Sequence, residues 1–149
     1  MVDKSPYDDL IMDHIKNARN YFMPCDANRM ATGTNPLCGD NLTIYLTVVS
    51  DKIKDIAFQC TCCGISMASA SIMTELMKGR DTHDAENQLQ AFTTMLHERP
   101  AASSRVATRE QIALLDTVQK FPPRKDCAAL PWATLEKAIG QQQHPISDR

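Results

Sequence analysis

Two alternating apolar segments joined by a short polar turn constrain the fold of this 149-residue chain more than any other feature. In LTIYLTVV (42–49), every second side chain is apolar, which is typical of a half-buried strand. In IKDIAFQC (53–60), Ile56, Phe58 and Cys60 fall on one face of a second strand. Residues 50–52, SDK, supply the turn, so the two segments predict an antiparallel hairpin.

Helical periodicity flanks this hairpin on both sides. Apolar residues recur there every three or four positions, which is the period of a helix with one buried face. This pattern predicts five helices, at about 5–22, 65–78, 84–97, 109–120 and 132–139, and Gly79 should end the second of them. Pro24 should end the first helix, one short strand fits near 28–33, and the prolines of FPPRKDCAALP (121–131) should interrupt helix. The pattern predicts an α+β fold, a small antiparallel sheet of about three strands with helices packed on one side. We expect a single domain over 1–149, with a frayed tail at about 141–149.

Composition excludes several classes of function. The 16 basic and 18 acidic residues give a net charge of −2 without any long block of like charge, so we expect no nucleic-acid or membrane partner. The N-terminal residues lack the apolar core of a signal peptide, and no apolar run approaches the length of a membrane span. We therefore expect a cytoplasmic protein, in which six cysteines favour metal binding or catalysis over structural disulfides.

Cys38 and Asp40 lie in NPLCGDN, directly before the first hairpin strand. In an extended chain, residues two apart project to the same side, so a thiolate and a carboxylate would point together. Such a mixed pair suits a divalent metal. A buried cysteine beside an ordinary Asx-turn explains the tripeptide about equally well.

Cys63 and Cys127 each stand where a helix is expected to begin. At Cys63 the free backbone N–H groups and the positive end of the helix dipole would stabilise a thiolate, which is both ligand and nucleophile. Close packing of the small residues that follow Cys63, and burial of Cys127 beneath Trp132, are the alternative explanations. Together with Cys38 and Asp40, these cysteines form four candidate ligands from three separate loops, unlike the paired C-x-x-C spacing of a structural zinc ribbon.

The other cysteines are harder to assign. Cys60 and Cys62 would share a face if the strand persists while Cys63 turns away, so three neighbouring thiols do not make one tetrahedral site. Core packing is the better explanation for Cys60, the role of Cys62 stays open, and Cys25 has no evident partner.

Three stretches resemble the NifU N-terminal/IscU/SufU family of iron–sulfur cluster assembly proteins: NPLCGDNLTIYLTV, IKDIAFQCTCCGISMASASIMTELMKGR and FPPRKDCAALPW. They occur in the family's order and extend over nearly the whole chain. The most specific pieces are the C-G-D triplet, the C-x-I-S-x-A-S-x-S run and the late R-x-x-C-A-x-L-x-W. The 63 residues between Cys63 and Cys127, and the lack of an L-P-P-V-K motif, resemble the SufU branch more than IscU.

The resemblance implies a metal site at Cys38, Asp40, Cys63 and Cys127, the same four residues. It implies Zn²⁺ as the bound ion and a sulfur shuttle that takes persulfide sulfur from a SufS-type cysteine desulfurase, with Cys38 as acceptor and Cys127 as its rival. The alternative is an IscU-like scaffold that builds a transient [2Fe–2S] cluster and passes it to apo iron–sulfur proteins or later SUF components. Both chemistries require thiolates that can leave the metal and return, and hence an exposed site at loop tips.

The sequence departs from the family at a few positions. Asp126 stands where SufU-like members usually carry Lys, so it is a candidate extra oxygen ligand or a charge that weakens docking of an acidic partner. Cys60 and Cys62 stand where SufU-like relatives commonly carry Gly. Two further functions stay open: a purely structural zinc module, and a dithiol redox protein that uses Cys60 or Cys62.

Overall fold

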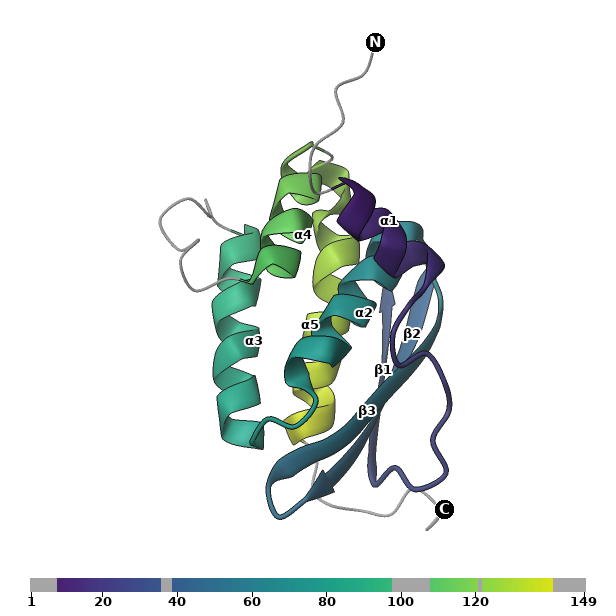
Figure 1. Cartoon of the computed structure of the whole chain (residues 1–149), viewed down its shortest axis with the longest axis vertical. Coiled ribbons are helices and arrows are strands. Elements are labelled where there is room, and N and C mark those ends of the chain that lie inside the picture. Colours follow the sequence, from purple (N-terminus) through teal and green to yellow (C-terminus); the bar gives the residue numbers. More distant parts are fainter. Residues whose placement is uncertain (1–7, 36–38, 98–107, 121, 141–149) are drawn as a thin grey trace.

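The computed structural model describes residues 8–35, 39–97, 108–120 and 122–140 (Figure 1). Along the chain the elements are α1 (Asp8–Lys16), β1 (Arg29–Asn35), β2 (Asp40–Val49), β3 (Lys52–Thr61), α2 (Gly64–Met77), α3 (Thr82–His97), α4 (Arg109–Lys120), a 3₁₀ turn (Pro122–Arg124) and α5 (Lys125–Gly140). This is the predicted α+β fold. The expected tail at 141–149 lies outside the described residues, and the single domain over 1–149 stays a prediction.

The three strands form one antiparallel sheet in the order β1-β2-β3. The predicted hairpin is confirmed: Val49 pairs with Lys52, and the two turn residues Ser50 and Asp51 have φ of 52° and 63°. Two successive residues with positive φ give the twist that a two-residue hairpin turn requires. The predicted strand near 28–33 is β1, and its pairing with β2 brings Asn35 opposite Asp40.

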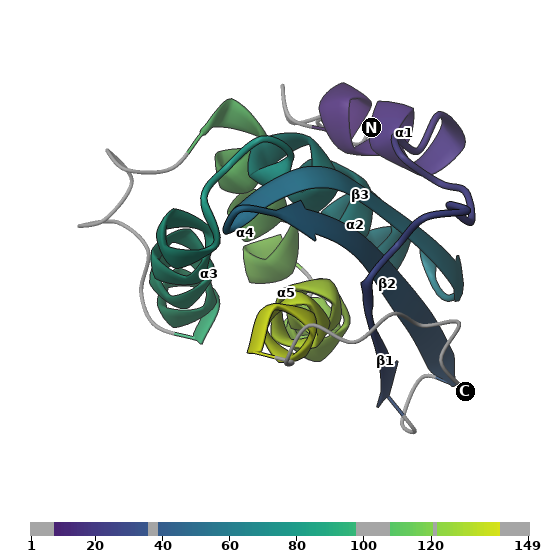
Figure 2. The same ribbon diagram turned by 90° about the horizontal axis from the view of Figure 1, so that it is seen from below.

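Helices α2 and α5 cover one face of the sheet, and the sheet curves around α5 (Figure 2). The alternating residues of β2, Leu42, Ile44, Leu46 and Val48, are almost fully buried beneath them. Trp132 of α5 is fully buried and its ring lies 4.4 Å from that of Phe92 in α3. Gly33 of β1 lies so close to α5 that a side chain at this position would meet Thr134. The helices therefore share one core with the sheet.

The first helix ends earlier than the sequence predicts. We expected it to reach Phe22 and Pro24, but α1 ends at Lys16. The chain then reverses through Asn20, with φ of 62°, and the Asn20 carbonyl accepts a 3.0 Å hydrogen bond from the Phe58 N–H at the edge of β3. The edge strand thus gains a backbone hydrogen bond from a carbonyl that the expected helix, ending before Pro24, would have left without an intrahelical partner.

The other helices follow the predictions, except at the start of α5. α4 has the predicted bounds, and Gly79 after α2 adopts the expected left-handed conformation, with φ of 86°. However, α5 begins at Lys125, well before Trp132, and contains Pro131. Pro131 has no N–H to give to the Cys127 carbonyl one turn earlier, and the hydroxyl of Ser66 donates a 2.9 Å hydrogen bond to that carbonyl. A side chain from α2 thus satisfies the gap, and the helix continues through the proline.

Candidate metal centre

Three of the four predicted ligands meet in the structure. One ligand atom from each of Asp40, Cys63 and Cys127 lies within 4.8 Å of the others. Asp40 is the first residue of β2, Cys63 directly precedes α2 and Cys127 lies in the first turn of α5. Residues up to 87 positions apart in sequence therefore converge where one strand and two helices begin.

Asp40 holds this convergence together. Its side chain is 3% exposed, and its Oδ1 accepts a 2.9 Å hydrogen bond from the backbone N–H of Cys63. Its Oδ2 lies 2.9 Å from the hydroxyl oxygen of Ser66 in the first turn of α2, and this hydroxyl shares its one proton between the carboxylate and the Cys127 carbonyl. A buried carboxylate at the positive end of a helix is stabilised both by the N–H donors and by the helix dipole. Asp40 thus fixes the start of α2 to the start of β2.

Cys63 is the N-cap residue of α2, as the sequence predicts, with an extended backbone at φ −72° and ψ 168°. Its side chain makes no capping hydrogen bond, and its half-buried Sγ lies 3.8 Å from Asp40 Oδ2 and 3.7 Å from Ser66 Oγ. The N-cap position is normally filled by an oxygen that bonds the free N–H groups. Here the position instead presents a sulfur toward the carboxylate.

Cys127 is fully buried, and Asn35 of β1 donates its side-chain N–H toward Cys127 Sγ at 3.9 Å. Asn35 is itself 8% exposed and pairs with Asp40 across the strands. Sequence reasoning missed both Asn35 and Ser66. The signal for Ser66 was present, because a serine on an apolar helix face must find a hydrogen-bond partner when it is buried.

The donor set fits a tetrahedral zinc ion. Zinc in proteins binds Cys sulfur at about 2.3 Å and carboxylate oxygen at about 2.0–2.2 Å, which places its ligand atoms about 3.4–3.8 Å apart. The three described donors, already within 4.8 Å of one another, need only a small contraction to reach that spacing. The hydrogen bonds of Ser66 to Asp40 and of Asn35 to Cys127 are the outer contacts that orient ligands in such sites.

The remaining site predictions have mixed outcomes. Cys38, the fourth expected ligand, lies outside the described residues. The expectation of an exposed site at loop tips is wrong for the described ligands, because Asp40 and Cys127 are buried and Cys127 lies within a helix. The reason is that α2 and α5 pack against each other over the start of β2.

Asp126 is exposed in the first turn of α5 and does not belong to the ligand group found among the described residues.

The two cysteines before Cys63 are paired with each other. Cys60 and Cys62 form a disulfide, with Cα atoms 5.5 Å apart. Cys60 also packs against the core, as the sequence favoured. Cys25 is a free, exposed cysteine.

Comparisons with known proteins agree with this fold and site. Residues 6–128 match the model of a protein family described as NifU-like N terminal domain. The zinc-dependent sulfurtransferase SufU of Bacillus subtilis is 36% identical over 137 residues, which is 92% of this chain and 91% of the relative. The iron–sulfur cluster assembly scaffold protein IscU of Thermotoga maritima is 28% identical over 145 residues, 97% of this chain and all of the relative.

Solved structures show the same architecture. A crystal structure of an iron–sulfur cluster assembly scaffold protein for the SUF system from Fervidobacterium islandicum superposes with a TM-score of 0.78, at 31% identity over 91% of this chain and 96% of that one. A NifU-like N-terminal structure from Brucella abortus superposes with a TM-score of 0.73, but at 18% identity it supports the fold alone. None of the described helices is long and apolar enough to cross a membrane.

Proposed function

Because the chain belongs to the family of NifU-like N-terminal domains, we propose that it is an iron–sulfur cluster assembly protein of the SufU type. It accepts persulfide sulfur from a SufS-type cysteine desulfurase at a zinc site made by Cys38, Asp40, Cys63 and Cys127. The observation that carries this proposal is the meeting of Asp40, Cys63 and Cys127 within 4.8 Å, from three separate elements. The similarity to a zinc-dependent sulfurtransferase over nearly the whole chain supports it.

A bound ion would hold the cysteines as thiolates, which are the nucleophilic form, and the acceptor thiolate would have to be free to attack a persulfide. Cys127 is poorly suited to leave the site, because it is fully buried. Asn35 contacts its sulfur, and the hydroxyl of Ser66 bonds its backbone carbonyl. Cys63 is held at the N-cap of α2, next to the carboxylate of Asp40. We therefore favour Cys38 over its rival Cys127 as the acceptor, with Asp40 as the oxygen ligand that fixes the site while sulfur is exchanged.

A second function deserves a test, because several matched relatives are named IscU scaffold proteins, including the Thermotoga one. In that function the same three thiols and one carboxylate hold a [2Fe–2S] cluster as cargo, for transfer to apo iron–sulfur proteins. The ligand chemistry does not separate the two, because zinc and iron–sulfur clusters both bind thiolates. Metal content of the purified protein separates them.

The decisive experiment measures sulfide release by a SufS-type desulfurase in the presence of the wild-type chain and of Cys38→Ala, Cys63→Ala and Cys127→Ala, together with zinc and iron content. We expect the wild type to contain zinc and accelerate sulfide release, and each substitution to abolish the acceleration. Cys25→Ala is the matched control, because this exposed cysteine lies outside the ligand group and should change neither readout. Unchanged acceleration by all three variants would refute sulfur acceptance, whereas iron with labile sulfide in place of zinc would favour the scaffold.

Asp126 offers a separate test of partner docking. Because Asp126 is exposed and outside the ligand group, we expect Asp126→Lys to change affinity for the desulfurase and to leave zinc content unchanged. Loss of zinc with unchanged affinity would show instead that Asp126 supports the metal.

A further inference from the structure

The pair Cys60–Cys62 lies directly before the candidate ligand Cys63, at the end of β3. Strand geometry projects residues two apart to the same side, and the structure joins the two sulfurs in a disulfide without interrupting the pairing of Thr61 with Asn41. Both cysteines are half-buried. The disulfide thus forms within the strand pairing of β3, and neither cysteine is fully buried.

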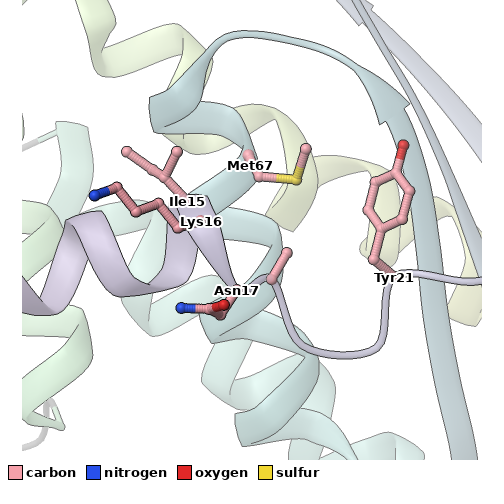
Figure 3. A pocket seen from close by; sticks show the side chains of 6 residues that line it. Ile15, Lys16, Asn17, Tyr21 and Met67 are labelled. Carbon is pink, nitrogen blue, oxygen red and sulfur yellow. The ribbon is translucent and has the colours of Figure 1, made fainter.

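A pocket of about 300 Å³ lies between the end of α1, Tyr21 and the start of α2 (Figure 3). It is lined by Ile15, Lys16, Asn17, Ala18, Tyr21 and Met67. Met67 Sδ lies 4.0 Å from Cys60 Sγ, and the hydroxyl of Tyr21 donates a 2.9 Å hydrogen bond to the Cys60 carbonyl while accepting one of 3.3 Å from the Cys60 N–H. Two side chains of the pocket wall thus contact Cys60 directly, and the open volume is enough for a small thiol or the tip of a cysteine-bearing loop.

We propose that Cys60 and Cys62 form a redox-active pair that supplies the two electrons needed to convert sulfur delivered as a persulfide into sulfide. This inference rests on the proposed function, because it requires a persulfide at the neighbouring site. A sulfur acceptor that holds only persulfide needs a reductant before sulfide can be used. Here the reductant is built into the chain, one residue from Cys63.

The sulfur of Cys62 attacks the outer sulfur of the persulfide, the S–S bond of the donor breaks, the donor cysteine regains a thiol and Cys62 now carries the persulfide. Cys60 then attacks Cys62 Sγ, the bond from Cys62 Sγ to the outer sulfur breaks, and hydrosulfide leaves as the Cys60–Cys62 disulfide forms. In sum, one persulfide and two thiols give one thiol, one disulfide and H₂S. The outer sulfur gains two electrons and the two cysteine sulfurs lose one each.

This order of attack avoids a disulfide between the adjacent residues Cys62 and Cys63, which the peptide between them would strain. Cys60 is the resolving partner, since its backbone is held on both sides by Tyr21 and its sulfur contacts Met67. The disulfide is returned to the dithiol by an external thiol reductant, either a protein dithiol or a small thiol, which approaches the two half-buried cysteines from solvent.

The test is a single turnover with the full chain. The zinc-loaded protein is reduced, freed of reductant and mixed with a SufS-type desulfurase and one equivalent of ³⁵S-labelled cysteine. Radioactivity measures the released sulfide and the protein-bound label. Peptide mass spectrometry measures the Cys60–Cys62 disulfide. The wild type should release about one sulfide per chain and form one disulfide. The Cys60→Ser/Cys62→Ser variant should keep the label as protein-bound persulfide and release at least about fivefold less sulfide. Cys25→Ser is the matched control and should behave as wild type.

The outcomes separate this inference from the proposed function. If no label reaches the wild-type chain, sulfur acceptance itself fails. If label reaches both proteins and both release sulfide equally, or if sulfide appears while Cys60 and Cys62 remain thiols, the redox pair is overturned. The single variant Cys62→Ser, checked for native fold by circular dichroism and for zinc content, guards against a folding defect. It should accept label and release little sulfide, and equal release by this variant would also overturn the inference.

Discussion

The indole Nε1 of Trp132 donates a 2.7 Å hydrogen bond to the hydroxyl of Ser69, inside the contact between α5 and α2. The same hydroxyl donates a 2.6 Å hydrogen bond to the Ala128 carbonyl, and both side chains are fully buried. These two hydrogen bonds set the position of the α5 N-terminal half, and with it Cys127, relative to α2.

We expect Ser69→Ala to lower the free energy of unfolding by about 1–3 kcal/mol, because the buried indole N–H loses its acceptor. Urea denaturation measures this change. When Trp132 is first replaced by Phe, Ser69→Ala should lower the unfolding free energy by less, because there is no indole N–H that could lose its acceptor. Equal costs in the two backgrounds would show that the hydrogen bond is not what Ser69 contributes.

Ser66→Ala should weaken zinc binding by about 10–100-fold, the usual effect of removing an outer contact to a metal ligand. The hydroxyl of Ser66 bonds both the Asp40 carboxylate and the Cys127 carbonyl, each at 2.9 Å. Competition with a chromogenic chelator measures the affinity. Thr117→Ala is the control, because its buried hydroxyl donates a 2.9 Å hydrogen bond to the Ala113 carbonyl within α4, away from the ligand group. It should reduce stability and keep a zinc affinity near that of wild type. Equal losses in both variants would contradict a specific role for Ser66.

Stability should fall as the pH drops below about 6.5, partly because of His14. Burial lowers the pKa of the His14 imidazole from its ordinary value of 6.5, and the charge of Arg19 lowers that pKa further, against the opposing charges of Glu75, Asp13 and Glu110. Because the pKa of His14 is lower in the folded state than in the unfolded state, the unfolded chain takes up a proton first as the pH falls. The contribution of neutral His14 to the unfolding free energy is therefore complete above pH 6.5 and is lost as the pH falls from 6.5 toward the folded pKa.

The His14→Gln variant checks this dependence. Unfolding free energies at pH 7.5 and 5.5 should differ less in this variant than in wild type, because no ring remains to be charged on unfolding. His83→Gln, at an exposed position of α3, is the control and should keep the wild-type difference. A pH dependence in His14→Gln equal to that of wild type would assign the effect to other groups.

Gly33→Ala should reduce the unfolding free energy by about 1–3 kcal/mol, the typical cost of overpacking. A methyl group at this position would clash with Thr134 Oγ1 and would also lie 3.1 Å from Leu130 Cδ1, so either the Thr134 side chain would have to rotate or β1 and α5 would have to separate. Thermal unfolding measures the loss, and adding Thr134→Ala should recover part of it. Gly140→Ala is the control, because a methyl group at that position meets no atom within 4 Å.

The sequence by itself determined much of the local structure and named the residues of the candidate site. The alternation in 42–49 and 53–60 predicted the hairpin, and the periodicity of α4 predicted its bounds, because each depends on residues at most a few positions apart. The same local reasoning placed Cys63 at the start of α2 and selected Asp40 and Cys127 as candidate ligands, and the structure brings these three residues together.

Only the tertiary structure decided how these parts meet. The early end of α1 depends on hydrogen bonds to the edge of β3, and the passage of α5 through Pro131 is accompanied by a hydroxyl from α2 at the Cys127 carbonyl. The burial of Asp40 and Cys127 follows from the packing of α2 and α5 over the start of β2. Such contacts join residues tens of positions apart, and their free energy exists only once the core has formed, so no local pattern of residues encodes them.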